Sequence, residues 1–193
     1  MNEIVRKRID LLCPLLKDSG PVVRTAAAAA IERLEGLNGL DEILATLTTG
    51  SRGERVSAVR ALGIIGGERV VEPLVQCAGR PEEDIRAAAV EELGRLAVPE
   101  TLPVLLGRVN DPNTAVQARA IAALGNFPPS PAICARLHPF LNANDGALEA
   151  EAVISLARLA DQTILAVIPD LLASPHDSTR QAAATALGLL PLQ

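Results

Sequence analysis

The chain has 193 residues, a hydrophobic content of 49% supplied mainly by Ala, Leu and Val, and a formal net charge of −5. Neutralising nucleic-acid phosphates needs a surplus of basic residues, so the acidic balance excludes a general nucleic-acid binder and favours a protein or small-molecule partner. The sequence contains neither a run of about 18 apolar residues nor the apolar segment of a signal peptide after the basic residues 6–8, so we expect a cytoplasmic protein with no membrane partner.

A repeat of 31 residues runs through the sequence. At this step Leu62, Leu93 and Leu124 superimpose, and we call them anchors, together with Ile31 before them and Leu156 and Leu187 after them. The residue four positions before each anchor is alanine in all six cases: Ala27, Ala58, Ala89, Ala120, Ala152 and Ala183. Such a period is typical of a solenoid whose repeats stack on their neighbours. We therefore predict a single repeat domain over 1–193, with units at approximately 1–37, 38–67, 68–98, 99–128, 129–161 and 162–193.

Each unit is predicted to contain two helices in the order A, then B. Helix A carries apolar residues 19 and 15 positions before the anchor, beginning with Leu12 and Leu16. A turn such as 18–21 follows, in which Asp or Ser suits a helix cap and Pro suits a first turn. Helix B has apolar residues spaced i, i+3, i+4 and i+7 around the anchor, which gives it one apolar face. Glycines near its end predict a left-handed cap or a close helix contact: Gly63, Gly66, Gly94, Gly125 and Gly188.

These patterns predict twelve helices and an all-α fold, an α/α superhelix (solenoid) of about six helical pairs. The repeated alanine has a small side chain and is expected to let helices A and B approach closely. Cys13 and Cys77 stand in the apolar columns, so both thiols are predicted to be buried. No CxxC pair or nearby histidine gives the cysteines the spacing of metal ligands.

Four segments resemble HEAT repeats of the short bacterial type found in phycobilin lyases: Val59–Gly63, Val71–Leu74, Ile121–Gly125 and Ala184–Gly188. The resemblance implies an array in which the B helices line a concave binding surface. HEAT units usually place an Asp in the inter-helix turn and an Arg six residues later, as Asp18 and Arg24 do here. For the arginines of this column we predict turn capping, not ligand binding: Arg24, Arg55, Arg86 and Arg180.

Polar side chains on the outer face of helix B form the candidate partner-binding surface. The helical wheel directs five arginines away from the core, with Asp84, Glu91 and Glu151 among them: Arg33, Arg60, Arg95, Arg119 and Arg158. Apolar residues such as Ile154 share this face. Arginine binds carboxylates through two hydrogen bonds and is common in interface hot spots. We therefore predict a non-catalytic scaffold whose partner is a protein with an acidic segment.

No catalytic, cofactor-binding or metal-binding residues are predicted. His138 and His176 lack the neighbouring Glu with which HEAT-like deoxyhypusine hydroxylases bind iron, and no Cys-His or Ser-His-Asp arrangement is evident. The absence of Trp and Tyr departs from HEAT-like alkylpurine glycosylases, which stack damaged bases on aromatic side chains. The enzyme-class alternative is a phycobilin lyase-like or chromophore-chaperone subunit, which the repeat resemblance supports and the lack of aromatic pocket residues opposes.

The last predicted helix ends in the apolar segment 187–193, where a capping repeat is expected to be polar. This edge predicts a contact with a second copy of the chain or with further repeats.

Overall fold

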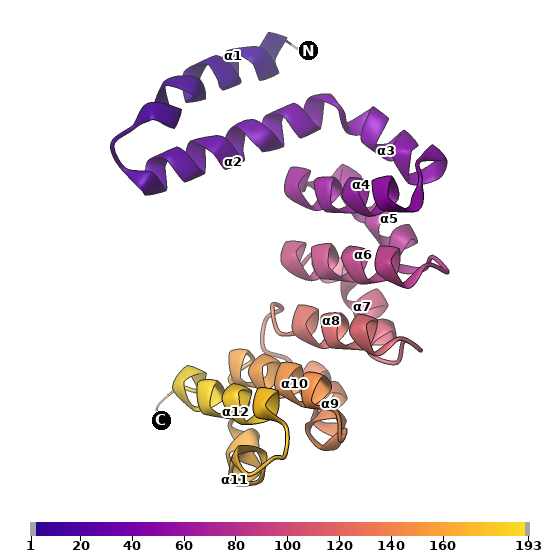
Figure 1. The fold of residues 1–193 in the computed structure, drawn as a ribbon, viewed down its shortest axis with the longest axis vertical. Coiled ribbons are helices and arrows are strands. Elements are labelled where there is room, and N and C mark those ends of the chain that lie inside the picture. The colour runs from indigo at the N-terminus through magenta and orange to yellow at the C-terminus, as the bar shows by residue number, and fades with distance from the viewer. Residues whose placement is uncertain (1–2, 192–193) are drawn as a thin grey trace. The chain divides into compact units, whose positions relative to one another are not determined.

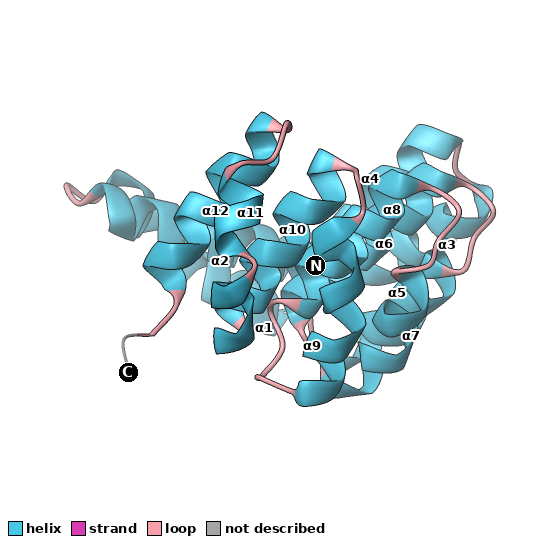
Figure 2. Cartoon of the chain, turned by 90° about the horizontal axis from the view of Figure 1, so that it is seen from below, coloured by secondary structure: helices cyan, strands magenta, loops and turns pink. Residues whose placement is uncertain are grey.

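The computed structural model describes residues 3–191. Within this range all regular structure is helical, with twelve α-helices and four short 3-10 helices (Figure 2). The predicted all-α fold of helical pairs is thereby confirmed. None of the helices in the described range is both long enough and apolar enough to cross a membrane.

The chain divides into two compact units, which we describe separately: Met1–Cys77 and Ala78–Gln193. The first contains α1 (Glu3–Leu12), the 3-10 helix η1 (Cys13–Lys17), α2 (Pro21–Asn38), α3 (Leu40–Thr49), α4 (Arg52–Ile65) and nearly all of α5 (Glu68–Ala78). The second contains α6 (Glu83–Leu96), η2 (Pro99–Thr101), α7 (Leu102–Arg108), α8 (Thr114–Leu124), α9 (Pro131–Leu137), η3 (His138–Asn142), α10 (Gly146–Arg158), η4 (Gln162–Ala166), α11 (Ile168–Leu172) and α12 (Asp177–Leu189). A single domain over all 193 residues remains a prediction.

The second unit is built in two layers. Its B helices α6, α8, α10 and α12 lie side by side, each in contact with the next (Figure 1), while α7 packs against α6 and α8, α9 against α10, and α11 against α12. Two of these helices begin at residues that are suited to a helix cap. The side chains of Asn113 and Asp145 cap α8 and α10 by accepting hydrogen bonds from backbone N–H groups of the first turn.

The repeated columns form the core. All six alanines four residues before the anchors are buried, and four of the six anchors are completely buried: Leu62, Leu93, Leu124 and Leu156. These alanines therefore belong to the core, and their role in letting helices A and B approach closely remains a prediction. Cys77 is buried as predicted.

Several predicted core positions in the first and last repeats are exposed instead, including Leu16 and Leu172 of the helix A column. Cys13 is exposed, because no residue of α1 or η1 is buried and the column that forms core in later repeats is open in the first one. Leu187 is 45% exposed, because no helix of the described range covers that side of α12. The apolar end of the chain therefore reaches solvent at Leu187 and Leu189, while Leu192 and Gln193 lie outside the described residues.

The predicted glycines serve two purposes. Gly66 ends α4 with φ of 63°, a left-handed conformation that suits glycine. Gly94 instead lies inside α6, where a Cβ atom would come within 2.3 Å of the Cβ of Ala123 on α8. Gly125 makes a similar close approach to Ser155 on α10. At these positions the absence of a side chain sets the spacing between neighbouring B helices.

The arginine column caps the turns between helices A and B, as predicted. Arg24 Nη1 donates to the carbonyls of Asp18 and Ser19, and Arg180 Nη1 donates to that of Ser174. Arg86 Nη1 binds two turn carbonyls in the same way, while its Nε and Nη2 bind both carboxylate oxygens of Asp111 in the next repeat at 2.9 Å. This buried ion pair connects two adjacent repeats.

Candidate functional site

Charged side chains from three neighbouring B helices surround one hollow in the second unit. The outer face of α6 carries Glu91, that of α8 carries Arg119, and that of α10 carries Glu151 and Arg158. Together with Ala122, Ala123 and Asn126 these side chains line a hollow of about 430 Å³, which we call the charged hollow. The small alanines leave the space open.

The two glutamates of the charged hollow differ in their surroundings. Glu91 Oε2 lies 2.6 Å from Nη1 of Arg119, so this ion pair connects α6 with α8. Glu151 has no hydrogen bond or ion pair within residues 3–191. Burial raises the pKa of its carboxyl group, although the charges of Arg158 and Arg119 oppose the shift. Arg158, which is exposed, also lacks a partner in the described chain.

A second hollow adjoins the first on the same face. It measures about 260 Å³ and lies between α10 and α12, where Glu151 and Ile154 line one side and Gln181 and Thr185 the other. Glu151 lines both hollows, which lie on either side of α10, one toward α8 and the other toward α12.

The structure places the predicted surface residues in three groups. Glu91, Arg119 and Arg158 line the charged hollow, and Ile154 lies in the adjoining one. Arg95 lines neither, because its Nε binds the largely buried carboxylate of Glu92 at 2.9 Å.

Arg33 and Arg60 are exposed on α2 and α4 of the first unit. The predicted surface did not include Ala122 or Asn126, which stand at the same positions relative to their anchor as Glu91 and Arg158 but carry no charge.

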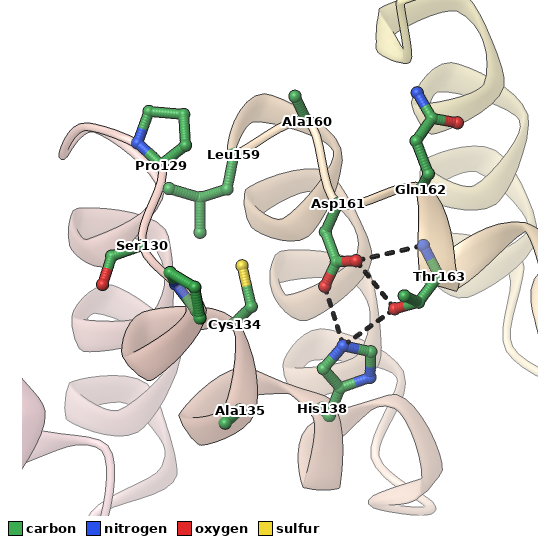
Figure 3. A pocket seen from close by; sticks show the side chains of 11 residues that line it. Pro129, Ser130, Cys134, Ala135, His138, Leu159, Ala160, Asp161, Gln162 and Thr163 are labelled. Atoms are coloured by element: carbon green, nitrogen blue, oxygen red, sulfur yellow. Dashed lines mark hydrogen bonds and ion pairs between the residues drawn. The ribbon is translucent and has the colours of Figure 1, made fainter. Parts of the chain in front are cut away.

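A separate pocket of about 540 Å³ contains Cys134, His138, Asp161 and Thr163 (Figure 3). The sequence analysis was wrong to find no Cys-His grouping, because Cys134 and His138 lie four residues apart at the end of α9 and share this pocket. The carboxylate of Asp161 joins them from the turn after α10, with His138 Nε2 at 2.8 Å from Oδ2. Only the i, i+4 spacing of Cys134 and His138 signalled the grouping in the sequence.

The polar side chains of this pocket connect two parts of the fold, the start of η3 and the turn after α10. Burial raises the pKa of Asp161, but hydrogen bonds from Thr163 and His138 outweigh it and leave the pKa below its usual range. Burial, followed by the charge and hydrogen bond of Asp161, raises the pKa of the Cys134 thiol. A nucleophilic cysteine needs a lowered pKa, so this arrangement does not activate Cys134. Within residues 3–191 no three His, Cys, Asp or Glu side chains are grouped to hold a metal ion.

Comparison with known proteins identifies the repeat. The family model for HEAT repeats matches residues 9–86 and 71–141, which together cover more than half of the chain. The chain belongs to the HEAT repeat family. The repeat type predicted from the sequence is therefore confirmed.

Solved structures share the HEAT fold of this chain. The complex of CpcE and CpcF of phycocyanin lyase from Nostoc sp. PCC7120 matches with a TM-score of 0.64 and 20% identity, over 78% of this chain and 99% of that chain. An engineered protein matches with a TM-score of 0.60 and 20% identity, over 98% of this chain and 96% of its own. No curated protein sequence matches the chain. The predicted similarity to phycobilin lyases is confirmed at the level of the fold.

Proposed function

We propose that this chain is a non-catalytic scaffold that binds a protein partner on the surface formed by the second helix of each repeat. The observation that carries the proposal is the charged hollow, in which side chains from α6, α8 and α10 converge and Arg158 has no partner within the described residues. An acidic segment of a partner is suited to Arg158, because guanidinium groups bind carboxylates through two parallel hydrogen bonds.

The contrast between two sets of arginines supports this function. The turn arginines use their donors within the fold, as Arg86 does with Asp111 and two carbonyls. On the B helices, Arg158 and Arg60 are exposed and lack partners within residues 3–191. Exposed guanidinium groups that the fold does not use are available to a ligand.

A location in a bacterial cytoplasm is part of the proposal. Cys13, Cys77 and Cys134 are all free, which suits a reducing compartment. The resemblance to short bacterial HEAT repeats favours a bacterial source. One continuous repeat domain with a concave B-helix surface belongs to the same proposal.

Affinity capture tests the scaffold function. The tagged full chain is used as bait in lysate of the source organism, beside a variant carrying Arg60→Glu and Arg158→Glu. Arg136→Glu is the matched control, because Arg136 is exposed on α9, in the layer behind the B helices. Arg95 is left intact, since its reversal would place two carboxylates beside each other at Glu92.

The expected result is one stoichiometric protein that the control retains and the double variant loses, with melting curves unchanged. If the variant with both Arg60→Glu and Arg158→Glu still captures the protein, the partner binds another face of the molecule. Capture that the control loses as well would indicate a general charge effect.

The second candidate is a phycobilin lyase-like or chromophore-chaperone subunit. It is favoured by the fold shared with a phycocyanin lyase structure over 99% of that chain. Adding a free bilin to the purified chain tests this function, because binding would change the visible absorption spectrum of the bilin. An unchanged spectrum at excess protein would reject it.

The exposed apolar end of α12 supports a contact with a second copy or with further repeats. Leu187 and Leu189 are 45% and 47% exposed, and apolar surface of this kind is often covered by another protein surface. Light scattering on the purified chain tests the homodimer. A dimer that Leu187→Glu dissociates is expected, and a monomer at all concentrations would contradict it.

A further inference from the structure

Two opposite charges in the charged hollow form no hydrogen bond or ion pair within the described part of the chain. Glu151 and Arg158 belong to the same helix, α10, and both line the hollow. Seven residues along an α-helix correspond to two turns, or roughly 10 Å along its axis. Within residues 3–191 neither side chain forms an ion pair, whereas Glu91 and Arg119 on the opposite wall bind each other at 2.6 Å.

The hollow therefore does not present a purely basic surface. Arg119 is already paired with Glu91, whereas Arg158 and Glu151 form no ion pair within the described residues and affect each other only through their charges. Glu151 is half-buried, and burial raises its pKa in spite of the nearby Arg158 and Arg119. A carboxylate that has lost water contacts without gaining a partner is stabilised by a new cation beside it.

We propose that the charged hollow recognises a helical segment of a partner protein that carries a basic and an acidic side chain two turns apart. The basic side chain lies against Glu151 and the acidic one against Arg158. This inference rests on the proposed scaffold function and specifies its partner as carrying both charges, not an acidic segment alone.

A helix is the segment whose geometry fits this pair. A helix lying along α10 has the same rise per residue, so its side chains at i and i+7 repeat at the spacing of Glu151 and Arg158. On the α12 side of α10, the adjoining hollow is lined by Ile154, which stands between Glu151 and Arg158 in the sequence and offers apolar contact to the same segment. Charge and spacing together select such a helix over an unpatterned acidic chain.

Nuclear magnetic resonance titration of the isotope-labelled full chain with synthetic peptides tests the inference. Three alanine-based peptides of about 20 residues, long enough to form helices, carry Lys and Glu seven residues apart, Glu at both positions, or Lys at both positions. The Lys-Glu peptide is expected to shift the amide signals of α8 and α10 and to bind more tightly than the other two.

Two variants that each remove one charge supply the residue-level test. Glu151→Gln and Arg158→Gln are each expected to weaken binding of the Lys-Glu peptide about two- to fivefold, the range of an exposed ion pair. Arg136→Gln, on α9, is the control and is expected to leave the affinity unchanged. Equal binding of the two-Glu peptide, no loss with Glu151→Gln, or no binding of any peptide would overturn the inference.

The failure of this inference is distinguishable from failure of the scaffold function. If lysate capture is lost with Arg158→Glu but survives Glu151→Gln, the scaffold function stands and the two-charge partner is rejected. If capture survives both changes, the B-helix surface itself is rejected.

Discussion

Replacing Asp111 with alanine is expected to lower the free energy of unfolding by about 3–5 kcal/mol, the usual cost of removing one partner of a buried ion pair. The Asp111 side chain is fully buried and accepts from Arg86 Nε and Nη2 at 2.9 Å, from Arg108 Nη1 at 3.3 Å and from the Asn113 backbone at 3.0 Å. Its removal leaves the Arg86 guanidinium, whose side chain is only 10% exposed, without its hydrogen-bonded counter-charge and with only the weaker influence of Glu82 and Glu83.

Asp41→Ala is the matched control for this prediction. Asp41 pairs with Arg69 at 3.0 Å, nearly the same distance, but the two side chains are 88% and 69% exposed. Exposed pairs contribute about 0–1 kcal/mol. Urea unfolding followed by far-UV circular dichroism measures both variants. Equal loss of stability in the two variants would refute the argument that burial makes the Asp111 pair important.

The same carboxylate predicts a pH dependence. Burial tends to raise the pKa of Asp111, but hydrogen bonds from Arg86 and Asn113 outweigh it and hold the pKa below its usual range. An unfolded aspartate titrates near pH 3.9. The stabilising contribution is therefore complete above about that pH and is lost as the pH falls through the lower folded value. The stability difference between the wild type and Asp111→Ala is expected to shrink in that acid range, and a constant difference would contradict the pairing.

Three further changes test packing and reactivity. Gly94→Ala is expected to destabilise the protein by about 1–3 kcal/mol through overpacking. Gly107→Ala, where the new Cβ atom meets open space, is expected to stabilise the protein by about 0.5–1 kcal/mol. Equal melting temperatures of the two variants would contradict the close helix contact at Gly94. Ala89→Leu, at a fully buried site, is expected to cost about 1–3 kcal/mol, and an unchanged melting curve would argue against its placement. At neutral pH iodoacetamide is expected to alkylate exposed Cys13 before Cys134, whose thiol pKa is raised; faster labelling of Cys134, read by mass spectrometry, would show an activated thiol.

Turn capping by arginine illustrates what a single sequence predicts well. The column of Arg24, Arg86 and Arg180 was assigned to the turns because each arginine follows its turn by the same number of residues. The structure confirms this, with each Nη1 donating to carbonyls five or six residues earlier. A contact within one repeat involves short sequence separations, so local geometry alone determines it.

The repeat columns predicted burial less well in the first and last repeats, which have a neighbouring repeat on one side only. The columns correctly identify Ala120 and Leu124 as buried, since their helix α8 lies between α6 and α10. The same reasoning fails for Cys13 and Leu187, which belong to the first and last repeats. A repeat column records the environment of an average repeat, and the terminal repeats have fewer neighbours.

The sequence by itself determined the repeat, the two helices of each unit and the apolar face of helix B, because the 31-residue period and the 3.6-residue helical period repeat along the chain. Only the tertiary structure decided which charges meet. Arg119 binds Glu91 on the neighbouring helix, while Arg158 and Glu151 form no ion pair within the described residues. These contacts join different repeats, so they depend on the stagger between packed helices and on side-chain rotamers, which the periodicity of one sequence does not specify.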